Sequence, residues 1–229
     1  MLNLMKLELK KYKMGGNIVG GFLATFMIMA FVILLNYDPT EEAAFSDYNA
    51  VVAAINTFVS VTFTIFASVL LSKFIIDEYK SGSIIVLFMY PMERKKLLTA
   101  KLLIVVLFTF LFGILARVVV FAGFYVYNHY AHFVLGELET EFLLQTGVGV
   151  LVNSAMVSFI SLVPLYFGMR KHSVPATIVS AIIIGSVLNS TNGNDFTLNS
   201  IIIVPVIIAA IGIFVAYWSI RNVEMKDVA

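Results

Sequence analysis

The polar side chains that could line a path for a ligand lie inside long apolar segments. Asn56, Ser60 and Thr64 follow one another at intervals of four residues, so a helix would place them on one face. Because hydrocarbon cannot hydrogen-bond such groups, this face should meet other helices or a polar path. Hydrogen bonding between neighbouring helices is the commoner explanation, and a substrate path is the alternative.

One charged side chain, Arg117, lies deep in the apolar run that follows Lys101. A helix rises about 1.5 Å per residue, which puts Arg117 roughly 24 Å beyond Lys101 in a hydrocarbon core about 30 Å thick. The favoured interpretation is an arginine that extends towards the membrane surface, and the alternative is an outer gate or a contact with substrate. The candidate partners just beyond the run are Glu137, Glu139 and Glu141.

A later apolar segment carries two lines of small or polar residues. One line is Gln145, Gly149 and Asn153, and the other is Ser154, Ser158 and Ser161. The candidates for a translocation path are therefore the polar residues of three segments: Asn56, Ser60, Thr64, Arg117, Gln145 and Asn153.

No pattern in the sequence predicts catalysis. The motifs H-E-x-x-H, G-x-S-x-G and G-x-x-x-x-G-K-[ST] do not occur. The chain has no cysteine, which excludes disulfides and thiol chemistry. His129 and His132 lie among aromatic residues, which favours an interfacial belt over a metal site. We expect no enzyme, no metal site and no cofactor bound by this chain. With a net charge of +1, we expect no nucleic-acid partner either.

The composition is that of a membrane protein. Of 229 residues, 60% are hydrophobic and the mean hydropathy is +0.96, whereas soluble domains are about 45–50% apolar. We expect an all-α, polytopic protein forming a single transmembrane domain over residues 1–229, with Pro164 kinking the fourth span. The six expected spans are about 17–35, 49–76, 102–127, 142–167, 174–188 and 201–220.

The distribution of Lys and Arg predicts that both termini are cytoplasmic. With both ends inside, the inner segments hold 14 of the 15 cations, and the outer loops hold none but carry eight of the 14 acids. Residues 1–14 place apolar side chains and lysines on different faces of a helix, which predicts an amphipathic elbow helix at the membrane surface.

The long polar break on the cytoplasmic side is residues 77–101. Its middle, Ile84–Tyr90, is apolar but too short to cross a bilayer. A short helix at the membrane surface, beginning near Ser83 and ending at Pro91, fits this pattern.

This region resembles the first cytoplasmic loop of the permease (transmembrane) subunits of bacterial ABC transporters of the type-2 exporter class. The shared pattern is an acid, Gly-Ser, an apolar turn, Pro-x-x-Arg and a lysine. The matching residues are Glu78, Gly82, Ser83, Leu87, Pro91, Arg94 and Lys101. The resemblance implies a coupling helix between spans two and three that docks on a separate ATPase. It assigns that coupling to Glu78, Gly82, Ser83, Leu87, Pro91 and Arg94. The alternative is a basic loop that only sets topology.

The resemblance also implies the function. The chain would be the membrane-spanning subunit of an ATP-driven exporter in the cell membrane, with ATP and Mg bound by partner ATPase subunits. A second permease copy or a related permease would complete the path. Small polar and apolar side chains suit an amphipathic or hydrophobic cargo, and a peptide, such as an antimicrobial or cytolytic peptide, is favoured over lipids, drugs and polysaccharides. The alternative is a stand-alone membrane protein, either a secondary transporter or an immunity or sensor protein. The absence of acids from the spans argues against the secondary transporter.

Overall fold

The computed structural model describes residues 2–12, 14–35, 45, 47–80, 94–131, 134, 140–171, 173–189 and 203–222. All regular secondary structure in these ranges is helical, which confirms the predicted all-α class. The helices in chain order are α1 (Leu2–Lys11), α2 (Gly15–Leu35), α3 (Tyr48–Leu71), the π-helix η1 (Ser72–Ile76), α4 (Asp77–Lys80), α6 (Arg94–Ala131), α7 (Thr140–Ile160), α8 (Pro164–Lys171), α9 (Val174–Asn189) and α10 (Ile203–Asn222).

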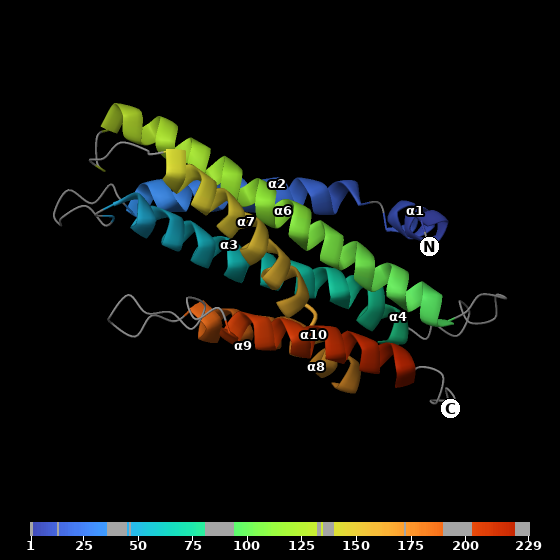
Figure 1. Ribbon diagram of the computed structural model, residues 1–229. Helices are drawn as coiled ribbons and strands as arrows, with labels where there is room; N and C mark the ends of the chain where they lie inside the picture. Colours follow the sequence, from blue (N-terminus) through green and yellow to red (C-terminus); the bar gives the residue numbers. More distant parts are fainter. Residues whose placement is uncertain are drawn as a thin grey trace.

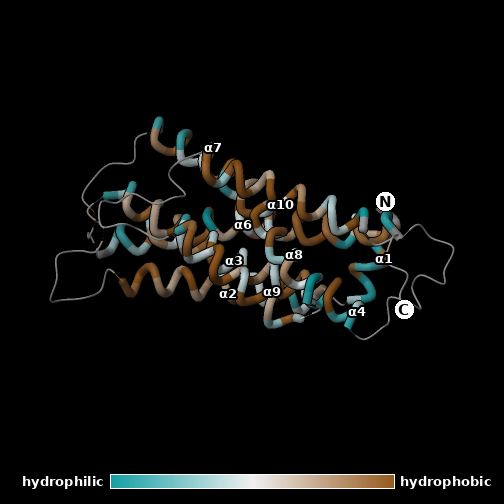
Figure 2. The backbone as a smooth tube through the Cα atoms, turned by 90° about the horizontal axis from the view of Figure 1, so that it is seen from below, coloured by the Kyte–Doolittle hydropathy of each residue, from teal (hydrophilic) through white to brown (hydrophobic). Residues whose placement is uncertain are grey.

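The long helices run side by side and form an elongated bundle (Figure 1). Five described segments are long and apolar enough to cross a membrane, and α9 is a shorter apolar helix beside them. Hydrophobic residues fill the length of the bundle, and hydrophilic residues gather towards its ends (Figure 2). The protein is therefore a multi-pass membrane protein, because apolar helices of this length satisfy their own backbone hydrogen bonds in hydrocarbon.

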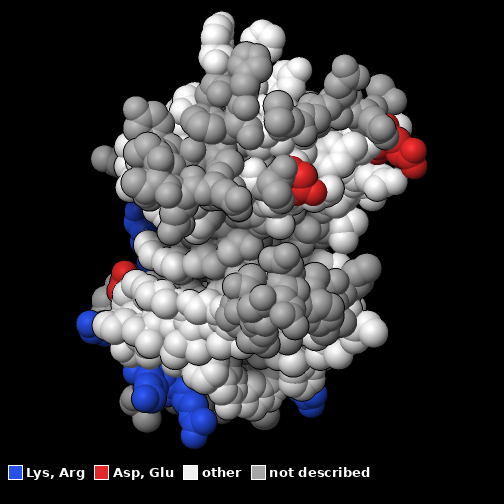
Figure 3. Space-filling view, turned by 90° about the vertical axis from the view of Figure 1, so that its left-hand side faces the viewer, with Lys and Arg blue, Asp and Glu red and all other residues white. Residues whose placement is uncertain are grey.

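The two ends of the bundle differ in which helix ends they hold. The helix ends that border residues 36–47, 132–139 and 190–202 lie at one end, and the start of α1 and the end of α10 lie at the other (Figure 1). Seen from the first of these ends, acidic side chains appear on the upper half of the surface and at its left margin, while Lys and Arg lie along the left and lower margins (Figure 3).

Two of the expected segments have different limits in the structure. The break expected at 77–101 is shorter, because α4 continues the line of α3 to Lys80 and α6 already begins at Arg94. The fourth expected span is not one helix. It divides into α7 and α8 at a turn over residues 161–163, directly before Pro164, whose ring cannot be accommodated in a helix interior.

An aromatic seam joins α3 to α6. Phe66 of α3 stacks on Phe108 of α6 with ring centroids 5.5 Å apart, and Phe108 stacks on Phe112 at 4.4 Å. Phe22 of α2 meets the edge of Phe112 at 5.5 Å, which adds the first long helix to the same seam. Such pairs contribute about 0.5–1.5 kcal/mol each beyond their buried area.

Two glycines allow α9 and α10 to approach the rest of the bundle. A Cβ at Gly185 of α9 would lie 3.6 Å from the Cα of Val61 in α3. A Cβ at Gly212 of α10 would collide with the carbonyl oxygen of Phe159 in α7. Small residues at such crossings bring helix backbones together, which is the main source of helix association within a membrane.

Candidate functional site

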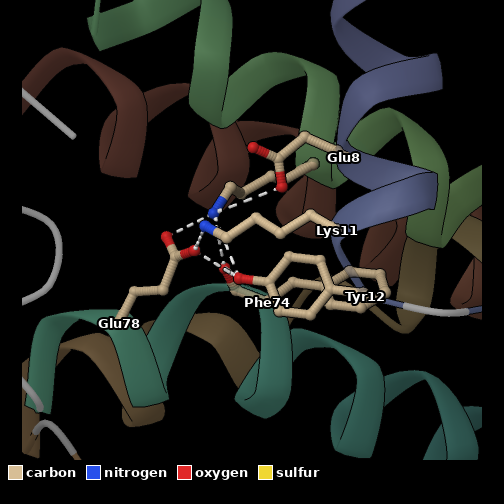
Figure 4. A network of polar contacts seen from close by, with 6 residues as sticks. Glu8, Lys11, Tyr12, Phe74 and Glu78 are labelled. Carbon is tan, nitrogen blue, oxygen red and sulfur yellow. Dashed lines mark hydrogen bonds and ion pairs between the residues drawn. The ribbon is translucent and has the colours of Figure 1, made fainter. Parts of the chain in front are cut away.

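A cluster of buried charges joins α1 to the two helices that border residues 81–93. We call it the Glu78 cluster (Figure 4). It consists of Glu8, Lys11, Tyr12, the Phe74 carbonyl, Glu78 and Lys101.

Glu78 is the centre of this cluster. One of its carboxylate oxygens accepts from Lys11 Nζ at 2.6 Å and from the Tyr12 hydroxyl, and the other accepts from Lys101 Nζ. Only 7% of Glu78 and 1% of Lys101 are exposed. A single buried carboxylate therefore connects α4 to both α1 and α6.

Lys101 has further partners besides Glu78. Its Nζ donates to the Phe74 carbonyl at 2.9 Å and lies 3.7 Å from Glu8 Oε2. Phe74 belongs to the π-helical turn, a geometry that often marks functional positions within helices. Among the described residues of the cluster, two lysines thus face two carboxylates.

Tyr12 completes the cluster as a neutral donor. Its ring packs on that of Phe74 with centroids 4.4 Å apart. Burial, together with the hydrogen bond to the Glu78 carboxylate, raises the pKa of the Tyr12 phenol above its ordinary value. The hydroxyl therefore stays protonated at neutral pH and keeps its hydrogen bond to Glu78.

A second buried site surrounds Arg117 in the middle of α6. We call it the Arg117 site. Its Nε donates to Asn56 Oδ1 at 2.8 Å and its Nη2 to Ser60 Oγ at 2.9 Å, both on α3. Its Nη1 donates to the Gly113 carbonyl and to Ser154 Oγ of α7, both at 3.1 Å. The guanidinium therefore bonds to three helices.

The expectation that Arg117 extends towards the membrane surface is wrong. The residue is 1% exposed, and its four hydrogen bonds lead into the bundle. Glu137 and Glu139 lie outside the described residues, and Glu141 instead accepts from Gln145 Nε2 at 3.3 Å on the exposed side of α7. Neutral groups within hydrogen-bonding reach hold Arg117 inside the bundle.

The six candidates for a path do not form one site. Asn56, Ser60 and Arg117 are in contact. Thr64 is buried and donates to the Ser60 carbonyl of its own helix at 2.7 Å. Gln145 is exposed and Asn153 is half-buried, and neither is among the described partners of Arg117.

Most of the residues expected at the coupling site lie outside the described residues: Gly82, Ser83, Leu87 and Pro91. Arg94 opens α6, but its side chain is outside the described set. Glu78, which we expected as a polar contact for an ATPase, is buried against α1 and α6. Within the described ranges, no three His, Asp or Glu residues are grouped as a metal site would need.

Comparison with known proteins identifies the family. The family profile of ABC-2 family transporter proteins matches residues 4–189. This chain belongs to the ABC-2 transporter family. It is therefore the permease, or membrane component, of an ABC transporter and not itself a catalytic subunit, which confirms the predicted resemblance.

A relative of this ABC-2 permease is found in Bacillus subtilis (strain 168). The two sequences are 40% identical over 228 residues, covering 99% of this chain and 100% of the relative, which is named uncharacterized protein YcbO. No solved structure matches the chain.

Sequence reasoning missed several residues of both sites in this ABC-2 permease. Glu8, Lys11 and Tyr12 were assigned to a surface helix. The one acid among the lysines of this helix was the signal that it could take part in ion pairs inside the protein. Ser154 belonged to a recognised line of small polar residues, but nothing in the sequence linked that line to Arg117. Gly113 precedes Arg117 by four residues, and that spacing is the signal for its contact.

Proposed function

We propose that this ABC-2 permease is the membrane-spanning subunit of an ATP-driven exporter whose motor is a separate ATPase. Two copies of the ATPase dock from the cytoplasm on the segment between α4 and α6. ATP and Mg bind to the ATPase subunits, since the permease sequence has no phosphate-binding loop. The Lys and Arg bias supports a cytoplasmic location for both termini, and the start of α1 and the end of α10 lie at the same end of the bundle.

The Glu78 cluster is the observation that carries this proposal. Residues 81–93 connect α4 to α6, and the ion pair between Glu78 and Lys101 ties these two helices together at the base of that segment. Because Lys11 and Tyr12 bind the same carboxylate, α1 is tied to this base as well. A push on the segment would therefore be transmitted through this base to α1, α3 and α6.

This arrangement changes the role proposed for Glu78. A carboxylate that is 7% exposed and already bound to two lysines has little surface left for a second protein. Glu78 acts by holding the base of the coupling segment, and direct contact with the ATPase falls to the residues from Gly82 to Arg94.

A second permease copy, or a related permease, completes the path. Only 22% of the residues in the most apolar stretch of α2, and 22% in that of α10, are buried, so most residues of both helices face lipid or another subunit. Both helices are apolar around their whole circumference, which suits either neighbour. One bundle of this size is half of the expected pathway.

The proposed cargo is amphipathic or hydrophobic, with a peptide such as an antimicrobial or cytolytic peptide favoured. The support is chemical: the described spans present apolar side chains and a few hydroxyl and amide groups. The alternative function, a stand-alone secondary transporter or an immunity or sensor protein, needs no motor and assigns no role to the base of the coupling segment.

The test is co-purification. The tagged permease is extracted from its native host in a mild detergent, and its partners are determined by mass spectrometry. Recovery of a soluble ATPase with a phosphate-binding loop, in near-equal amount, is expected. The Arg94→Ala variant should lower that recovery, whereas Arg221→Gln, at the exposed end of α10, should not. Recovery of the permease alone, under conditions that keep known ABC complexes intact, would reject the exporter in favour of a stand-alone protein.

A further inference from the structure

The Arg117 site contains a buried positive charge that no negative charge balances within the described residues. All four described partners of Arg117 are neutral: an amide oxygen, two hydroxyls and a backbone carbonyl. Neutral acceptors replace the water that a guanidinium loses on burial, but they leave its charge in place. The Glu78 cluster, in contrast, pairs each lysine with a carboxylate. Among the described residues, the middle of the bundle therefore carries an excess positive charge.

The positions of the two acceptors on α3 indicate what would complete the site. Nε and Nη2 of an arginine form the edge that binds the two oxygens of a carboxylate or phosphate in parallel. In this structure, that edge is taken by Asn56 and Ser60, which lie one helical turn apart on α3. Two neutral oxygens from one helix thus occupy the places of the two oxygens of an anionic group.

The other side of the guanidinium is held independently of α3. Nη1 bonds to Gly113 of its own helix and to Ser154 of α7. Gly113 leaves room for this contact, because a Cβ there would lie 3.3 Å from Nη1 and 3.4 Å from Ser154 Oγ. If α3 withdraws, Arg117 stays anchored and presents its free edge. A guanidinium has five N–H groups, and the second N–H of Nη2, on the side that faces Nη1, has no described acceptor.

We propose that Arg117 recognises an anionic group, a carboxylate or a phosphate, on the amphipathic cargo. The anion binds the Nε–Nη2 edge and displaces Asn56 and Ser60 when α3 moves away. This inference rests on the proposed function, because α3 leads through η1 and α4 into the coupling segment. ATP-driven movement of that segment would replace the Asn56 and Ser60 acceptors with the anionic group of the cargo. The return movement would restore the two acceptors to Arg117 and so expel the cargo.

The test uses four single-chain amphiphiles below their micellar concentrations: dodecanoate, dodecyl phosphate, dodecylamine and dodecanol. The purified permease is held in nanodiscs, and its apparent Tm is recorded against each probe. ATPase stimulation by each probe is then measured in the permease–ATPase complex. A saturable response to one or both anions, with none to the amine or the alcohol, is expected. Dodecanoate alone indicates a carboxylate cargo, such as a peptide C-terminus, and a response to dodecyl phosphate indicates a phosphate headgroup.

Variants tie this response to Arg117. Arg117→Gln should abolish it, and Arg117→Lys, which keeps the charge but lacks the parallel edge, should weaken it roughly tenfold. Arg221→Gln removes a cation from the exposed end of α10 and should respond like the unmodified protein. An equal response of Arg117→Gln to dodecanoate, or equal effects of dodecanol and dodecanoate, overturns the inference.

A second variant keeps the test decisive if Arg117→Gln does not fold. Asn56→Ala combined with Ser60→Ala removes both competing acceptors and leaves Arg117 in place. Anion binding should then tighten about tenfold, because α3 no longer competes for the edge. An unchanged anion response with a lower Tm shows a purely structural site. The Tm readout needs no ATPase, so absence of a motor overturns the proposed function alone, and a motor without an anion response overturns only this inference.

Discussion

Glu78 and Lys101 form a buried ion pair across the base of the segment that joins α4 to α6. The two residues are 23 positions apart, and the other residues that resemble a coupling helix, Gly82, Ser83, Leu87, Pro91 and Arg94, lie between them in the sequence. The pair thus fixes the two ends of the coupling segment at one point. α1 binds the same carboxylate, so the N-terminal helix is part of the mechanical base of the segment.

Removing the charge of Glu78 should weaken the fold and uncouple the motor. Glu78→Gln keeps the size of the side chain but removes its negative charge. Among the described residues, the carboxylate of Glu8, 3.7 Å away, is then the one that still faces Lys101. Breaking a buried ion pair costs about 3–5 kcal/mol. We expect a lower Tm in detergent and ATPase activity that no longer responds to cargo. The measurements are a thermal melt of the permease and ATPase activity of the complex.

A double-mutant cycle separates the pair from its surroundings. Glu78→Gln with Lys101→Met should be less destabilised than the sum of the single variants, because neither charge is then buried alone. Arg221→Met is the control, since Arg221 is exposed at the end of α10, far along the chain from the pair. Strictly additive losses would show that Glu78 and Lys101 act independently, which contradicts a shared role at the base of the segment.

The sequence predicts the helices more readily than their partners. The long apolar runs and the Lys and Arg bias depend on local composition, and they suffice for an all-α, multi-pass protein. The spacing of Asn56 and Ser60 places them on one face of α3, and both reach Arg117. Their contact crosses 61 and 57 positions, however, and depends on which helices are neighbours in the bundle, which periodicity within one helix does not specify.

The Glu78 cluster illustrates the same limit. Lys11 and Glu78 are 67 positions apart, and charges near the membrane surface are equally compatible with water or with a buried partner. The division between α7 and α8 was closer to prediction, because Pro164 alone signals an irregularity. Whether a proline bends a helix or ends it depends on the packing around it, and here a turn precedes it.

The Arg117 site should contribute to stability through its partners as well as through its charge. Arg117→Met retains volume but leaves Asn56, Ser60 and Ser154 without the donor that the structure gives them. A buried polar group left unsatisfied costs about 1–3 kcal/mol. We expect a clearly lower Tm for Arg117→Met. Adding Asn56→Leu, Ser60→Ala and Ser154→Ala should restore much of it, because a buried charge and its partners are often replaceable by apolar groups. No recovery in the combined variant would contradict this explanation.

Orientation in the membrane can be tested directly because the chain has no cysteine. Lys10→Cys on α1 and Tyr130→Cys near the end of α6 lie at opposite ends of the bundle, and both positions are exposed, Tyr130 at 81%. A membrane-impermeant maleimide added to intact cells should label Tyr130→Cys and spare Lys10→Cys. Permeabilised cells, in which both should react, provide the control. The reverse labelling pattern would place the termini outside and would contradict docking of a cytoplasmic ATPase at this end.

Two helical glycines give a matched test of the packing between α10 and α7. A Cβ at Gly212 would collide with the Phe159 carbonyl, and backbone cannot yield as a flexible side chain would, so α10 has to shift. Overpacking of this kind costs about 1–3 kcal/mol. Gly147 of α7 has no atom within 4 Å of the same Cβ position. Gly147→Ala should therefore be neutral or stabilising by up to about 1 kcal/mol, as for an alanine in a helix. Thermal melts should show a lower melting temperature for Gly212→Ala and an unchanged or higher one for Gly147→Ala. Equal melting temperatures would mean that α10 does not approach α7 this closely in the bilayer.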